Sequence, residues 1–103
     1  MSITIGRFLF EGPYANTQQL EDRSGIYVIL CSTDNKNYNI VDIGESSGVK
    51  SRVDNHDRAD CWKKNCTGSL AVAVYYTPNA QQSGRMEIEQ ELRKQYKPPC
   101  GDR

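Results

Sequence analysis

The 103-residue sequence has no excess of charge of either sign and no long apolar run. Its 13 basic and 13 acidic side chains cancel, which excludes a polycationic nucleic-acid coat and an acidic tail. The longest apolar run, Gly25–Cys31, is far shorter than the ~20 residues that a membrane span needs. We therefore expect no membrane partner. Repeats and low-complexity tracts are missing too, and the length fits a single domain.

The N-terminal residues lack the basic start and long apolar stretch of a secretion signal. We therefore expect a cytoplasmic protein in which the four cysteines stay reduced, because disulfides are rare in the cytosol. An even number of cysteines in a short chain is otherwise typical of disulfides. A zinc site formed by Cys61, Cys66 and His56 is a further alternative, although no second cysteine pair of the usual spacing accompanies it.

Apolar patterns predict an α+β fold: a small sandwich with a central three-stranded antiparallel sheet flanked by helices. The uncharged run Gly25–Cys31 is typical of a strand buried on both faces. Residues 38–44 follow after a polar turn and complete a hairpin, and residues 69–76 are the third strand. Helices are expected from about residue 49 onward and over residues 80–96.

Residues 1–24 precede the first of these strands and are interpreted as an extension that packs on a domain covering residues 25–103. The extension contains a short apolar segment of extended character. Asn16 can cap one or two helical turns that follow it.

Asp42 interrupts the otherwise apolar second strand. If Cys31 pairs with Tyr38 across the hairpin, Tyr27 lies directly opposite Asp42, and a phenol then lies beside a carboxylate. A carboxylate inside a core costs roughly several kcal/mol unless it is paired or metal-bound. The alternative is therefore that Asp42 lies at the end of the strand and faces solvent.

Arg52 and His56 are four residues apart, which predicts that they share one face of the helix after the hairpin. A guanidinium matches the geometry of a phosphate, and an imidazole can donate to a phosphate or move a proton. Gly44 ends the strand before this helix, whose free amides would attract an anion. Each residue alone also fits an ordinary role, as a solvated arginine, a structural histidine or a turn glycine.

Glu87, Glu89 and Glu91 flank the apolar stripe of the last helix, and the helical period does not choose among them. A glutamate that faces the sheet can hold Mg²⁺, which uses few carboxylates and keeps its waters.

The order of these residues resembles the GIY-YIG nuclease superfamily. GIY stands at residues 25–27, DIG at 42–44, an arginine precedes a histidine by four residues, and Glu89 precedes Pro98 by nine. The resemblance spans residues 25–101 and implies a metal-dependent endonuclease that hydrolyses phosphodiester bonds in DNA. The implied cofactor is one divalent cation, Mg²⁺ or Mn²⁺.

The resemblance also implies a catalytic role for each matching residue. Tyr27 corresponds to the tyrosine that positions or deprotonates the attacking water, and Arg52 to the arginine that stabilises charge on the phosphate. His56 corresponds to a histidine that is frequent one turn later. Glu89 matches the metal-binding glutamate, and Gly44 the glycine of the second motif.

Three positions depart from the family pattern. Asp42 replaces the usual tyrosine of the second motif, Glu45 follows where lysine or glutamine is common, and Gly101 stands where asparagine is frequent. An ionised Asp42 can take a proton through Tyr27 or add a second carboxylate to the metal, and it can equally repel a phosphate. The alternative function is therefore a catalytically degenerate GIY-YIG-fold module that binds nucleic acid or protein.

The residues expected to contact nucleic acid are Gly44, Lys50, Arg52, Lys63 and Lys64. Because acidic residues interrupt this basic stretch and the net charge is zero, binding should be weak and salt-sensitive. A homodimer or a partner protein is therefore expected to help hold the DNA.

Overall fold

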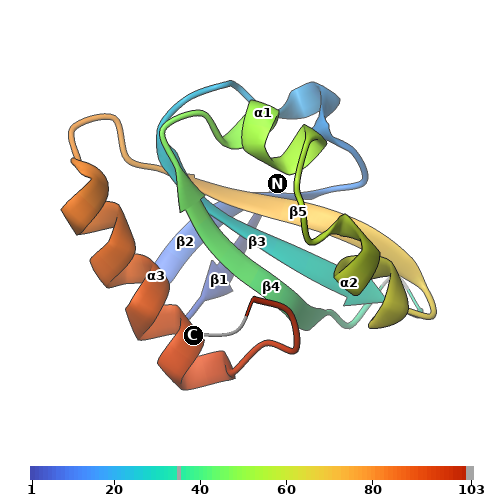
Figure 1. The fold of residues 1–103 in the computed structure, drawn as a ribbon. Helices are drawn as coiled ribbons and strands as arrows, with labels where there is room; N and C mark the ends of the chain where they lie inside the picture. Colours follow the sequence, from blue (N-terminus) through green and yellow to red (C-terminus); the bar gives the residue numbers. More distant parts are fainter. Residues whose placement is uncertain (35, 102–103) are drawn as a thin grey trace.

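Five antiparallel strands form one sheet in the computed structural model, which describes residues 1–34 and 36–101 (Figure 1). The strand order across the sheet is β1-β2-β5-β3-β4. The elements follow along the chain as β1 (Ser2–Ile5), β2 (Phe8–Tyr14), the 3-10 helix η1 (Thr17–Gln19), β3 (Gly25–Ser32), β4 (Asn39–Ser46), α1 (Val49–Asp54), α2 (Ala59–Lys64), β5 (Ser69–Tyr76) and α3 (Gln82–Tyr96).

The predicted three-stranded sheet is wrong, because β1 and β2 form a hairpin that adds two strands beside β5. The turn of this hairpin has Gly6 at φ 61°, a conformation that glycine adopts without steric cost. Phe8 and Phe10 of β2 are buried while Leu9 and Glu11 are exposed, the alternation of a strand with one covered face. The α+β character of the prediction is retained.

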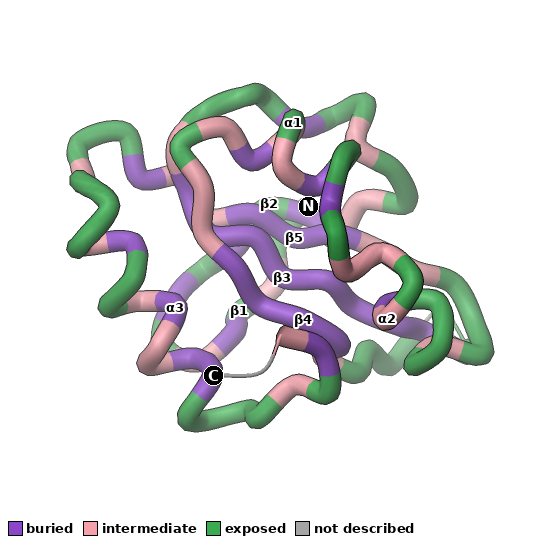
Figure 2. Tube along the Cα trace, viewed as in Figure 1, coloured by how far each residue is buried: buried purple, intermediate pink, exposed green. Residues whose placement is uncertain are grey.

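β3 lies inside the sheet and is coloured as buried along its length (Figure 2), and a hydrophobic cluster covers each of its faces. Tyr27 and Ile29 belong to the cluster that includes α1 and α2 residues, and Val28 to the one that includes Leu92 of α3. All eight β3 residues are buried, which confirms the prediction of a strand covered on both faces. No helix within the described residues has the length and apolar content needed to cross a membrane.

The register of the β3–β4 hairpin differs from the predicted one. Tyr27 pairs with Gly44, and Asp42 pairs with Ile29 instead of Tyr27. The hairpin starts one residue out of the predicted register, because Cys31 pairs with Asn39 instead of Tyr38. The register shifts by one more residue between Ile29 and Leu30, where Val41 is an additional residue on β4 that forms a bulge. A single inserted residue of this kind changes every pairing beyond it.

All four cysteines form disulfides, Cys31 with Cys66 and Cys61 with Cys100. The expectation of reduced thiols is therefore wrong in this structure. The zinc alternative fails with it, because Cys61 and Cys66 are each bonded to another sulfur and offer no thiolate to a metal.

The helices lie close to their predicted positions, with one correction that affects the site. α1 ends at Asp54, so His56 lies in the turn before α2 and does not share a helix face with Arg52. α3 ends at Tyr96 before the Lys97-Pro98-Pro99 segment, as predicted from the inability of proline to continue a helix.

Replacing Gly44 with alanine should destabilise the protein, because the added methyl group would overlap the phenol of Tyr27. Overpacking of this kind costs ~1–3 kcal/mol, and each kcal/mol lowers Tm by roughly 4–8 °C in a domain of this size. Gly84→Ala is the matched control, because its methyl group meets only the Ala80 Cβ at 3.5 Å and alanine favours helix. Calorimetry of the two variants checks this; a wild-type Tm for Gly44→Ala contradicts the placement of the Tyr27 ring.

Candidate functional site

Tyr27 of β3 and His56 of the α1–α2 turn contact each other beneath α1. The Tyr27 Oη atom lies 2.5 Å from His56 Nε2, and both side chains are buried. The Arg58 backbone N–H donates to His56 Nδ1 at 3.0 Å, so Nδ1 carries no proton in the neutral ring. The Nε2–H group therefore donates to the phenol oxygen, and His56 in this tautomer cannot deprotonate Tyr27.

Burial and nearby positive charge determine the protonation of this pair. Burial, followed by the charges of Arg52 and Arg58, lowers the pKa of His56 to about 4. Burial raises the pKa of Tyr27 to about 12, although the same two arginines act in the opposite direction. Both rings are therefore neutral at neutral pH.

Arg52 of α1 is the partly exposed cation of the site. Its side chain is half-buried and forms an ion pair with Asp57 at 3.1 Å. It lines a hollow of about 340 Å³ whose other walls are all polar or glycine: Ser46, Ser47, Gly48, Ser51 and Asn55. Arg52 therefore lies between the buried Tyr27–His56 pair and a polar depression of the surface.

The amides at the start of α1 do not offer the anion site expected from the sequence. Gly48 N donates to Ser46 Oγ, Val49 N to the Arg23 carbonyl, and Ser51 N to Asp22 Oδ1. Gly44 lies inside β4 under the Tyr27 ring and is buried. Recognition of a phosphate would therefore depend on the Arg52 side chain instead of on backbone amides.

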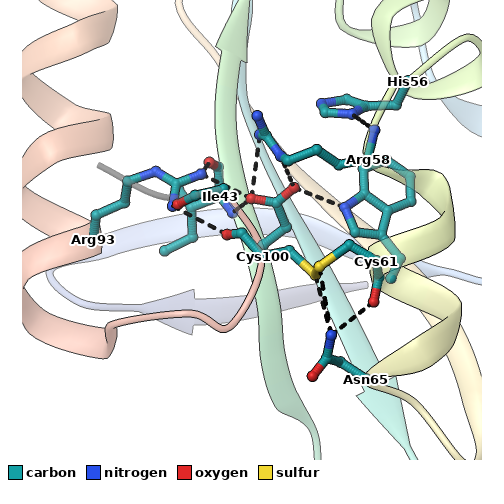
Figure 3. The surroundings of a disulfide bond; sticks show 10 residues. Ile43, His56, Arg58, Cys61, Asn65, Arg93 and Cys100 are labelled. Carbon is teal, nitrogen blue, oxygen red and sulfur yellow. Dashed lines mark hydrogen bonds and ion pairs between the residues drawn. A yellow bond between two sulfur atoms is a disulfide. The ribbon is translucent and has the colours of Figure 1, made fainter.

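Asp42 of β4 is fully buried, so the alternative in which it faces solvent is wrong. Its oxygens accept from Trp62 Nε1 at 2.7 Å, Arg58 Nε at 2.8 Å and Arg93 Nη2 at 2.8 Å, and from the Ile43 amide at 2.8 Å (Figure 3). Such a set of donors offsets the desolvation of a buried carboxylate. Asp42 therefore joins β4 to the α2 segment and to α3, and its oxygens are engaged in this role.

Burial distinguishes Glu89 from its two neighbours on α3. Glu89 is 1% exposed, whereas Glu87 is exposed and Glu91 pairs with Arg7 on the surface. Glu89 Oε2 lies 3.8 Å from Arg93 Nε. Arg85, one turn earlier, pairs with Glu45 of β4 at 3.0 Å, which offsets the negative charge that Glu45 was expected to add.

The expected lysine contacts do not gather around Arg52. Lys50 donates to the Thr17 carbonyl at 3.2 Å and lies 3.6 Å from Asp54, on the η1 side of α1. Lys63 and Lys64 are exposed in the last turn of α2. Within the described residues no three His, Cys, Asp or Glu side chains lie together as a metal site. A metal ion bound by Glu89 would therefore take its other ligands from outside the protein.

The sequence interpretation missed the structural roles of Arg58, Trp62 and Arg93. A signal for Arg93 was present, since Arg85, Glu89 and Arg93 repeat every four residues and form one charged row along a helix.

Comparisons with models of known protein families, with curated proteins and with solved structures found no match.

The single histidine of the chain makes its pKa directly measurable from the imidazole C2–H signal in proton NMR. The midpoint should lie near 4 in the folded protein and return to ~6.5 in urea. Since the unfolded state then binds more protons between these values, stability is full above about pH 6.5 and falls as the pH drops toward 4. A folded-state midpoint at or above 6.5 contradicts the buried, neutral His56.

Proposed function

We propose that this chain is a metal-dependent endonuclease of the GIY-YIG type that hydrolyses phosphodiester bonds in DNA. The observation that supports it most is the Tyr27–His56 hydrogen bond with Arg52 beside it at a polar hollow. These three residues were matched to the family by order alone, and they come from β3, α1 and the turn after α1.

Arg52 would contact the scissile phosphate. Its guanidinium is the accessible cation of the site, and its planar fork can donate two hydrogen bonds to phosphate oxygens. A phosphate there would compete with Asp57 for the same group. A positive group aimed at the charge that develops in the transition state is a large contribution to hydrolysis of this kind.

Tyr27 would orient the attacking water. With a pKa of about 12, roughly one phenol in 10⁵ is ionised at pH 7, so Tyr27 is a poor general base. Because its oxygen accepts from His56 Nε2–H, its own proton points elsewhere, and it would be donated to a water or a phosphate oxygen when a substrate reaches this buried phenol. His56 thereby fixes the direction in which Tyr27 donates.

Glu89 would hold Mg²⁺ or Mn²⁺. A single protein carboxylate fits Mg²⁺, which usually keeps several waters and binds substrate phosphates. When bound, the cation supplies Lewis-acid stabilisation of the phosphate and lowers the pKa of a coordinated water. Asp42 is left out of this machinery, because four donor groups already engage its oxygens.

The zero net charge favours weak DNA binding and therefore a homodimer or a partner protein as part of the functional assembly. The sequence also led us to expect a cytoplasmic protein. Two disulfides are typical of oxidising compartments and weigh against that location.

A second candidate function is a non-catalytic module of the same fold that binds nucleic acid or protein. Burial favours it, since Tyr27 and Glu89 are each 1% exposed and neither offers its oxygens to solvent. In this case Arg52 alone would contact the ligand.

Cleavage of plasmid and branched DNA with Mg²⁺ or Mn²⁺ tests the endonuclease. Wild-type protein should nick DNA, Arg52→Ala should lower the rate by ~10²–10³-fold, and Glu89→Gln should abolish the metal-dependent activity. Glu91→Gln on the same helix and Arg7→Ala are matched controls, because these two residues form an exposed ion pair with each other, and both variants should keep wild-type rates.

Two outcomes would overturn this proposal. Activity that survives both Arg52→Ala and Glu89→Gln indicates a contaminating nuclease. Salt-sensitive DNA binding by anisotropy, with no cleavage under any metal, supports the binding module instead.

A further inference from the structure

Both disulfides end in one short segment, residues 56–66. Cys61 lies in α2 and Cys66 just after it. α2 has six residues, no side-chain cap, and Trp62 as its buried residue. Helices shorter than ~12–15 residues are marginal on their own, so α2 depends on its attachments to the rest of the molecule.

The Cys61–Cys100 bond joins α2 to the C-terminal tail (Figure 3). Asn65 Nδ2 donates to the Cys61 carbonyl at 2.8 Å and lies 3.4 Å and 3.5 Å from the two sulfurs. In the tail, Cys100 N donates to the Val41 carbonyl at 3.0 Å, and Arg93 donates to the Cys100 carbonyl at 3.2 Å. This bond therefore holds together two segments that both cover Asp42.

The same segment carries the histidine of the candidate site. His56 contacts Tyr27, and its ring lies 4.6 Å from that of Trp62. Arg58 links His56 to Asp42, since its backbone amide donates to the His56 ring and its guanidinium donates to the Asp42 carboxylate. Movement of α2 would therefore displace His56 from Tyr27.

We propose that the Cys61–Cys100 disulfide is a redox switch, whose reduction releases α2 and the tail from Asp42 and uncouples His56 from Tyr27. The Cys31–Cys66 bond would keep the segment tethered, because Cys31 lies in β3, which is paired with strands on both sides. The inference rests on the contacts of His56 and Trp62 and does not depend on nuclease activity.

The reduction uses a dithiol reductant. One thiolate attacks the sulfur of Cys61, because Cys61 is a half-buried residue whereas Cys100 is only 1% exposed. The Cys61–Cys100 bond breaks, and Cys100 leaves as a thiolate that takes a proton. The second thiol of the reductant then attacks the mixed disulfide and releases the Cys61 thiol. Two electrons pass to the protein, and the reductant becomes a disulfide.

Two single-copy residues report the switch, since the chain has one tryptophan and one histidine. The variant Cys61→Ser/Cys100→Ser represents the reduced state, and Cys31→Ser/Cys66→Ser is the matched control. The first variant should keep its far-UV circular dichroism, shift the Trp62 emission to the red and raise the His56 midpoint from about 4 toward 6.5, a roughly 300-fold change in proton affinity. The control should match wild type in both readouts.

Titration of the wild-type protein with reduced and oxidised dithiothreitol gives a measurement without substitutions. Alkylation and mass spectrometry should show Cys61 and Cys100 reduced while the far-UV signal persists and Trp62 emission changes. The proposal is overturned if reduction coincides with global unfolding, which would make the bond a folding staple. It is equally overturned if the Cys61→Ser/Cys100→Ser protein keeps a His56 midpoint near 4.

Discussion

The buried carboxylate of Asp42 is the interaction on which both the edge of the sheet and the candidate site depend. An ionised carboxylate in a protein interior is costly unless charges and hydrogen bonds surround it. Here Arg58, Arg93 and Trp62 reach it from two segments far apart in the sequence. β4 is an edge strand, and this cluster fixes a helix and the C-terminal tail along it.

The contacts of Asp42 also connect the Tyr27–His56 pair with Glu89, the proposed metal ligand. A chain of alternating charges runs from Arg58 through Asp42 and Arg93 to Glu89. At one end the Arg58 amide sets the tautomer of His56 and so the direction of the Tyr27 hydroxyl. At the other end Arg93 places its guanidinium beside the proposed metal ligand. Asp42 therefore positions other residues, and in the proposed endonuclease it takes no direct part in the reaction.

Local sequence patterns predicted many of the strands and helices but not the contacts between segments that are distant in the sequence. The strand Ser69–Tyr76 and the stop after Tyr96 follow from residue chemistry that acts over a few positions. The bulge at Val41 could not be predicted in this way, since it is a property of the pairing between β3 and β4 over the length of both strands. The β1–β2 hairpin was not predicted for the same reason. The alternation of apolar and polar residues in β2 is short, and β2 is stabilised as a strand by its pairing with β5.

The site was predictable in part for the same reason. Tyr27, Arg52 and His56 were identified by their order, although the expected helix face shared by the last two does not exist. Burial, which the sequence does not encode locally, separates Glu89 from the other two glutamates, and its role as a metal ligand stays a prediction. Cysteine pairing was misjudged because the compartment argument does not consider which sulfurs the fold brings together.

The central claim is that the contacts of Asp42, held together by the Cys61–Cys100 disulfide, keep α2 and His56 in one place. Hydrogen exchange of the Trp62 indole N–H, a single signal in a nitrogen-correlated NMR spectrum, measures this most directly. If the indole donates to a buried Asp42, its exchange should be as slow as that of the β3 amides and should require global opening. Exchange at the rate of an exposed indole, while the β3 amides stay protected, would contradict the account.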